Sequence, residues 1–467
     1  MRVHQKGLLS WDDVDVEVNK AHKQQEALSV FPVSRTIDRY ETSFDHDGLV
    51  ANAGLIMVAT LMCRLGLERV ANEWLRTGSH APGRKICTLI AAMCAGATHI
   101  DHTDMLRAGA TQQVLPFRVM APSTIGTFLR SFTFGFVRQL DAVAARLLAN
   151  AWTAGAGPGN ADMVIDLDST ICEVHGHAKH GAGYGYTKRL GYHPLVATRA
   201  GTGEILFSRM RKGSAGSSRG INRFIDELAG ILKRARATGA KCVRADSGFW
   251  SWELLRTLDR HKMSWSITVT NHPKVKAAIA SIPDDAWVDI DYTLGGFAQV
   301  AETTYLGGGR RKKDRRTVRL VVRRTRLADT AQARLFPEWR HHSFITNRHD
   351  LNTIEADRFH REHAVVELAI RELKDGGAAH IPSGHYAANA AWFACAVIAH
   401  NLARWTVTIG GHEPVNNRTL RGQIIAVPAV AVNRSGRPTL RFPSRWPWRD
   451  DFTTMLTNLR ALPGPAG

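Results

Sequence analysis

Residues 163–170 read MVIDLDST, and residues 241–249 read KCVRADSGF. Each segment is a short apolar run that ends in an aspartate and a serine, which is typical of a buried strand followed by a turn. Between them, residues 193–201 and 203–211 predict the two arms of a hairpin, and residues 223–239 predict an amphipathic helix that ends at a glycine. The order β-β-β-α-β predicts an α/β fold.

The sequence before this core has a helical pattern. From about Leu49 to Leu148 apolar residues recur at spacings of three and four, and a glycine-rich stretch at 153–162 closes the region. We therefore expect an all-α N-terminal region over residues 1–155.

A helix-turn-helix is one interpretation of the later part of this region. Residues 104–115 and 122–132 have the length and spacing of two helices joined by a turn, with Ser123 as an N-cap. An ordinary helical pair in a bundle fits the pattern equally well, because the motif has no residue signature of its own.

The sequence after the first core segment predicts an interruption. Residues 273–344 read mostly as strands separated by glycine-rich turns, so we expect a β-strand insertion subdomain. It divides the core into a first part, 160–272, and a second part, 345–410, which contains a short strand, a long helix over about 352–375 and a second helix over about 386–408. Residues 411–467 carry arginines among prolines and tryptophans, and we expect a basic tail that forms an extended arm.

The charge of the chain points to nucleic acid. Against 42 Asp and Glu there are 61 Lys and Arg, which gives a formal net charge of +19, and the sequence pI is about 10.1. Such a charge attracts polyanions, so DNA is the expected partner and residues 1–155 are the expected DNA-binding region.

Targeting signals and cysteine motifs are not apparent. The N-terminus has no apolar signal segment, no apolar run is long enough to span a bilayer, and no lipidation motif suggests a membrane partner. The six cysteines form no CxxC pair, so neither a disulfide framework nor a zinc knuckle is indicated. A cytoplasmic location is expected.

Two carboxylates stand at the ends of predicted strands. In an open α/β sheet the carboxyl ends of strands meet where ligands bind, so Asp168 and Asp246 are expected to face each other. Carboxylate oxygens suit Mg²⁺, and phosphodiester cleavage uses two such ions roughly 3.5 to 4 Å apart. Two aspartates cannot hold both ions, so a third carboxylate is needed.

The helix with the sequence HREHAVVELAIRELKDG, residues 360–376, offers that third carboxylate. Its glutamates are Glu362, Glu367 and Glu372. Glu367 shares one helical face with four side chains that suit phosphate, two before it and two after it: His360, His363, Arg371 and Lys374. Glu367 is therefore the preferred candidate.

These segments resemble a known family. DLDST, ADSGF and HREHAVVELAIRELKDG, followed by GHYAANAAWFACAVIAHNLARW, are similar to the DDE transposases of bacterial insertion sequences, specifically the "thirteen-eighty" family in the group with a Tyr-Arg-Glu-Lys signature. The resemblance covers residues 162–405 and, more loosely, the helical N-terminus.

The resemblance implies an RNase H-like catalytic core of the retroviral-integrase superfamily. It implies that Asp168, Asp246 and Glu367 are catalytic and hold two Mg²⁺ ions, for which Mn²⁺ can substitute, and that Lys374 contacts DNA. It also implies cleavage at the terminal inverted repeats of an element, strand transfer into target DNA, and a homodimer that bridges two DNA ends in the nucleoid.

The sequence departs from the signature at two positions. His360 and His363 stand where the family has tyrosine and arginine, and histidine carries less permanent charge near neutral pH. We still expect both to bind DNA, together with Arg371. Asp166 lies two residues before Asp168, on the same strand face, and is either an auxiliary carboxylate or a strand-end residue.

Three further signals have two interpretations each. The cluster of Cys172, His175, His177 and His180 fits a loop beside the active site better than a zinc site. Ten basic residues between Arg310 and Arg326 favour a DNA-backbone contact over a solvated hairpin, and the first four are the DNA-binding candidates Arg310, Arg311, Lys312 and Lys313. Trp287 fits a buried core position better than a base-stacking one.

The leading functional hypothesis is a DNA transposase. The alternatives are an RNase H-like nuclease without strand transfer and a catalytically inactive DNA-binding regulator. Retention of Asp168, Asp246, Glu367 and Lys374 argues against the inactive protein.

Overall fold

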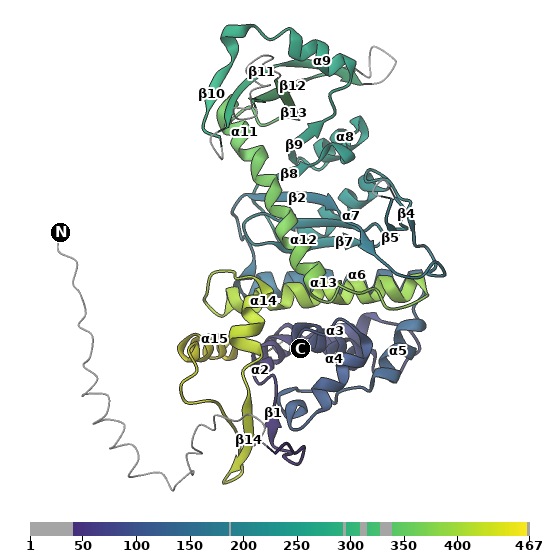
Figure 1. The fold of residues 1–467 in the computed structure, drawn as a ribbon, viewed down its shortest axis with the longest axis vertical. Coiled ribbons are helices and arrows are strands. Elements are labelled where there is room, and N and C mark those ends of the chain that lie inside the picture. Colours follow the sequence, from purple (N-terminus) through teal and green to yellow (C-terminus); the bar gives the residue numbers. More distant parts are fainter. Residues whose placement is uncertain (1–40, 186–187, 293–295, 309–314, 327–338, 465–467) are drawn as a thin grey trace, which may run out of the picture. The chain divides into compact units, whose positions relative to one another are not determined.

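The computed structural model describes residues 41–185, 188–292, 296–308, 315–326 and 339–464. The chain divides into two compact units, Met1–His46 and Asp47–Gly467. The second unit contains all the helices and strands that follow (Figure 1).

A large mixed sheet organises the second unit. Among the described residues it has nine strands in the order β10-β11-β12-β13-β9-β8-β2-β6-β7. The predicted hairpin pairs antiparallel beside the first predicted strand, while β8 and β9 lie parallel to it on the other side. The bounds of these five strands are β2 Met163–Ser169, β6 Leu195–Arg199, β7 Glu204–Arg209, β8 Lys241–Ala245 and β9 Ser264–Val269. The predicted α/β class is confirmed.

Helices cover the sheet and join its strands. The helix predicted between the second hairpin arm and β8 is α7, Ile221–Arg234, and α8, Trp252–Arg260, joins β8 to β9. Three short strands form a separate small sheet among the described residues, next to the end of β2: β3 Cys172–Glu173, β4 Gly183–Tyr184 and β5 Leu190–Tyr192.

The predicted insertion extends the main sheet. After α9, Pro273–Ala280, its strands are β10 Val288–Ile290, β11 Phe297–Gly308, β12 Arg315–Arg326 and β13 Arg340–Thr346. Strand β13 pairs antiparallel with β9, from Ser343 opposite Val269 to Thr346 opposite Ser266. This pairing satisfies backbone groups that would otherwise be exposed along β9, so the inserted strands continue the core sheet.

The N-terminal part of the unit is helical apart from the two-residue strand β1, Leu49–Val50. Its α-helices are α2 Leu55–Leu65, α3 Leu67–Trp74, α4 Pro82–Cys94, α5 Pro122–Arg130 and α6 Phe134–Ala151. The first half of the predicted helix-turn-helix consists of two 3-10 turns, Ile100–Arg107 and Thr111–Val114, so two α-helices joined by a turn are not formed here.

Helix α5 begins two residues earlier than the N-cap prediction required. Ala121 is the N-cap and Pro122 is the first helical residue, so Ser123 lies inside the helix and the N-cap prediction is wrong. Proline suits this position because its fixed φ matches a helix and its missing N–H has no partner there to lose.

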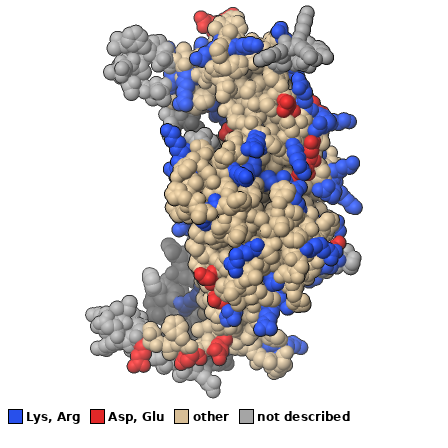
Figure 2. Space-filling model, turned by 90° about the vertical axis from the view of Figure 1, so that its right-hand side faces the viewer, with Lys and Arg blue, Asp and Glu red and all other residues tan. Residues whose placement is uncertain are grey.

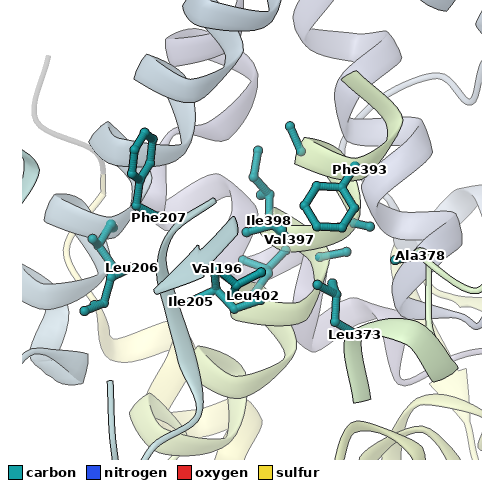
Figure 3. Packing of buried hydrophobic residues seen from close by; sticks show 14 of the residues in the cluster. Val196, Ile205, Leu206, Phe207, Leu373, Ala378, Phe393, Val397, Ile398 and Leu402 are labelled. Carbon is teal, nitrogen blue, oxygen red and sulfur yellow. The ribbon is translucent and has the colours of Figure 1, made fainter. Parts of the chain in front are cut away.

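The predicted helix over 352–375 has a break. It consists of α11, Thr353–Arg361, a 3-10 turn at Glu362–Val365, and α12, Val366–Asp375. Figure 1 shows α11 and α12 following one another along the sheet toward α13, Tyr386–Ile409. Helix α13 contacts β7 and the helices α2, α4, α5 and α6. Figure 3 shows Phe393, Val397 and Leu402 among the buried residues of this core.

The C-terminal residues fold against the helical part, and the prediction of an extended arm is wrong. After α14, Asn417–Leu420, they form β14, Ala429–Arg434, β15, Arg437–Arg441, and α15, Arg449–Ala461. Strand β14 pairs with β1, and α15 packs against α2 and α13. The physical reason is that Phe452, Met455 and Leu459 recur on one face of α15 and are buried.

Candidate active site

The two aspartates stand at the carboxyl ends of neighbouring parallel strands. Asp168 is the last residue but one of β2, which ends at Ser169, and Asp246 follows directly after β8. In the parallel register of these strands Leu167 lies opposite Ala245, so the aspartates occupy the next positions along each strand. The strand pairing therefore brings them to one edge, as the sequence predicts.

Glu367 comes to the same place from α12. It is the second residue of that helix, is exposed to solvent, and belongs to a helix that contacts β2. Burial and the negative charges of Asp246 and Glu367 raise the pKa of Asp168 to about 6, against the backbone N–H of Ser169 and the nearby His363, which lower it. The three predicted carboxylates thus lie within electrostatic reach of one another.

The donor chemistry of this cluster suits a divalent cation. Carboxylate oxygens are the preferred ligands of hard cations, and a cation would favour the ionised form of Asp168, which burial and the charges of Asp246 and Glu367 disfavour by raising its pKa. Within the described ranges no three His, Cys, Asp or Glu side chains form a ready-made metal cage. The residues present fit such an ion through their charge and donor type.

Lys374 lies beside the aspartate of β2. Its Nζ donates a hydrogen bond to Oγ1 of Thr170 at 3.2 Å, two residues beyond Asp168. Arg371 is exposed on α12, and the helical spacing places both cations on the face that carries Glu367. A phosphate that approached Asp168 would therefore meet Lys374.

His363 is buried between two aspartates. Its Nδ1 lies 2.9 Å from Oδ1 of Asp166, and its Nε2 lies 3.7 Å from Oδ1 of Asp246. The side chain is thus inside the site and turned toward carboxylates, which does not match the expected contact with DNA.

His360 does not face the site, in contrast to the expected DNA contact. Its Nδ1 lies 2.8 Å from Oγ of Ser266 and its Nε2 lies 2.9 Å from Oγ1 of Thr268, both on β9. The ring stacks on Phe344 with 4.1 Å between centroids, and desolvation holds its pKa well below the usual value. Both ring nitrogens already have partners, so the side chain packs the helix onto the sheet.

Asp166 forms a buried ion pair. Arg244, on β8, donates from Nε to Oδ1 at 2.7 Å and from Nη2 to Oδ2 at 3.0 Å, and both side chains are almost fully buried. Of the two interpretations of Asp166, the geometry favours an internal structural role. Arg244 was not predicted as part of the site, although an arginine inside an apolar strand two residues before Asp246 is an unusual feature of the sequence.

A serine-rich loop also borders the site and was not predicted. Oγ of Ser217 lies 3.0 Å from Oγ of Ser169, and a Cβ on Gly248 would come within 3.1 Å of Ser217. Buried Arg211 holds this loop by donating to the carbonyls of Gly216 and Ser217. The loop therefore lies between the two aspartate motifs.

The basic residues of the insertion, 273–344, have different environments. Arg310, Arg311, Lys312 and Lys313 lie outside the described residues. On β12, Arg319 pairs with Glu302 and Arg323 pairs with Asp357, so these two cations have internal partners. Arg315 is exposed. Figure 2 shows Lys and Arg spread over one face of the molecule, with fewer Asp and Glu.

The remaining signals have structural explanations. Trp287 is buried, as expected, with the guanidinium of Arg324 4.1 Å from its ring centroid. Cys172 is buried, and burial raises the pKa of its thiol to about 12, which disfavours metal binding by the cluster around it. Of the helices that the structure describes, none has the length and apolar character that crossing a membrane requires.

Comparisons with known proteins identify the family of this chain. A solved structure of the piggyBac transposase synaptic complex with hairpin DNA is similar at a TM-score of 0.44 and 10% identity, over 80% of each chain. No curated protein matches the sequence. The family model described as transposase DDE domain group 1 matches residues 36–464. Since this match spans nearly the whole sequence, the chain belongs to the DDE transposase family, group 1.

Proposed function

We propose that this transposase cleaves DNA at the ends of an insertion sequence, exposes 3′ hydroxyl groups, and joins them to target DNA. We assign it to the "thirteen-eighty" family, with an RNase H-like catalytic core. The observation that carries the proposal is the geometry of the site, in which Asp168 and Asp246 stand at the ends of neighbouring parallel strands and the helix that carries Glu367 contacts β2.

Enzymes of the DDE transposase family generally use divalent metal ions. We assign Asp168, Asp246 and Glu367 as catalytic residues that hold two Mg²⁺ ions, with Mn²⁺ as a substitute. When bound, such ions activate the attacking oxygen and stabilise the leaving one.

The DNA contacts follow from the cations around these carboxylates. Lys374 and Arg371 bind phosphates beside the scissile bond, and the four basic residues at 310–313 bind the DNA backbone farther away. The helical region within residues 1–155 binds the element ends. The solved piggyBac structure is a synaptic complex with hairpin DNA, which supports DNA as the partner proposed here. The working species is a homodimer that acts on DNA in the bacterial cytoplasm.

Single substitutions test the catalytic assignment. Asp168→Ala, Asp246→Ala and Glu367→Ala should each abolish cleavage that depends on Mg²⁺ or Mn²⁺ and should leave DNA affinity largely intact. Asp375→Ala removes an exposed carboxylate from the same helix and is the matched control, which should cleave normally. A variant of the three that still cleaves would remove that residue from the assignment.

Strand transfer separates a transposase from a nuclease. Wild-type protein mixed with precleaved end DNA, target DNA and Mg²⁺ should form paired-end complexes and join the ends. Lys374→Ala should form fewer complexes and join fewer ends, because it loses a phosphate contact. Cleavage without joining by the wild type would favour the nuclease, and joining by a complex with one protein chain would exclude the dimer.

A further inference from the structure

One buried guanidinium connects the two strands that lead to Asp168 and Asp246 with the helix that precedes the one carrying Glu367. Arg244 lies on β8, two residues before Asp246, and makes the bidentate pair with Asp166 on β2, two residues before Asp168. Its Nη1 also donates to the carbonyl of Phe359 in α11 at 2.5 Å and lies 3.3 Å from Oε2 of Glu362. The side chain of Arg244 on β8 therefore contacts both β2 and α11.

The helix changes its geometry where Arg244 contacts it. In a continuous α-helix the carbonyl of Phe359 would accept from the backbone N–H four residues later, at His363. Arg244 donates to that carbonyl, and the 3-10 turn Glu362–Val365 separates α11 from α12 at this point. Helix α12, which carries Glu367, begins directly after this turn.

The same ion pair orients His363. Oδ1 of Asp166 contacts both Nε of Arg244 and Nδ1 of His363, which leaves the other ring nitrogen turned toward Asp246. Asp166 is 1% exposed, so this arrangement is shielded from solvent. The chain of contacts runs from the buried pair to an aspartate of the site.

We propose that Arg244 is a positioning residue, which through Asp166, His363 and the α11–α12 break holds Asp168, Asp246 and Glu367 in the arrangement that binds metal. The inference rests on the proposed function. Loss of a group that hydrogen-bonds to metal ligands and orients them typically lowers metal affinity or activity by about 10- to 100-fold. Arg244 is almost fully buried, so it acts through these neighbours.

A double substitution separates positioning from stability. Asp166→Leu combined with Arg244→Met replaces a buried ion pair by apolar groups of similar size, a change that proteins often tolerate. The full-length variant should keep its melting temperature and its affinity for end DNA. Its affinity for Mn²⁺, measured by isothermal titration, and its single-turnover cleavage rate should fall by about 10- to 100-fold.

A matched pair of lysine variants covers the case in which the double variant does not fold. Arg244→Lys keeps a charge and loses the planar fork. Arg404→Lys does the same to another buried pair, with Glu372 of α12 at 2.8 Å, which holds no strand of the site. Only Arg244→Lys should raise the Mn²⁺ concentration needed for half-maximal binding. Addition of more Mn²⁺ should partly restore its cleavage.

Normal Mn²⁺ binding by a folded Arg244 variant would overturn the inference, as would equal loss in the Arg404→Lys control. Failure of the proposed function has a different result, since wild-type protein would then bind Mn²⁺ and fail to cleave end DNA. The binding measurement still distinguishes the Arg244 variants in that case.

Discussion

The position of the Asp168 carboxyl group lowers the stability of the folded state when this group is ionised. Its pKa of about 6 lies above the ordinary aspartate value of 3.8, so ionisation destabilises the fold above pH 6, and this penalty disappears as the pH falls toward 4. In the metal-free protein Asp168→Asn should therefore increase the free energy of unfolding at pH 8 by about 1 to 3 kcal/mol, reduced by residual solvent contact. Thermal melts in EDTA at pH 8 and pH 4 would measure it, and equal effects at both pH values would contradict the explanation.

Substitution of Asp166 should lower the stability of the metal-free protein, in contrast to substitution of Asp168. Asp166→Ala leaves the buried guanidinium of Arg244 without its carboxylate, which typically costs about 3 to 5 kcal/mol. We expect a clear loss of stability in chemical denaturation, while Asp168→Ala stabilises the metal-free protein or leaves it unchanged. A more stable Asp166→Ala protein would show that the pair contributes little to folding.

At the scale of elements, the strands were the most predictable part. Residues 163–169 and 241–245 form β2 and β8 because their apolar runs are bounded by turns, and that pattern is local. The break between α11 and α12 could not be read from the sequence, because its partner, Arg244, comes from a distant strand. The inward position of His360 likewise depends on Ser266 and Thr268 of β9.

The positions of the three carboxylates proposed to be catalytic were predictable because each stands beside a strand end or on a regular helix face. The C-terminal elements were not, because β14 is short and acquires a partner only when it pairs with β1, hundreds of residues earlier. The basic residues of the insertion, 273–344, could not be sorted into DNA contacts and internal ion pairs, because a sequence shows charge without showing which cations have internal partners.

Strand β12 carries both a cation with an internal partner and an exposed cation, so the two kinds can be compared by substitution. Arg323→Gln removes a partner of fully buried Asp357 and should lower the free energy of unfolding by about 1 to 3 kcal/mol. Arg315→Gln, on the same strand and exposed, should leave stability unchanged. Urea denaturation of both variants would check this, and equal stability would indicate that Arg361 alone satisfies Asp357.

At the scale of the whole molecule, the net charge of +19 should make DNA binding strongly dependent on salt. Neutralising Arg310, Arg311, Lys312 and Lys313 together should flatten the plot of log K against log salt by as much as about 0.9 per lost phosphate contact. Fluorescence anisotropy on random-sequence DNA would measure the slope. An unchanged slope would mean that these four residues face solvent in the complex.

Helix α13 limits how this protein can evolve. It is buried along nearly its whole length, with α2, α4, α5 and α6 on the helical side and β7 on the sheet side. If only the region before residue 156 were exchanged with that of a relative, the exchanged helices would have to pack against an unchanged α13. Their buried side chains would then need to fit those of α13 without further substitutions. The helical part and the catalytic part are therefore expected to be inherited together, so that a change in the DNA ends recognised must arise by substitution within one lineage.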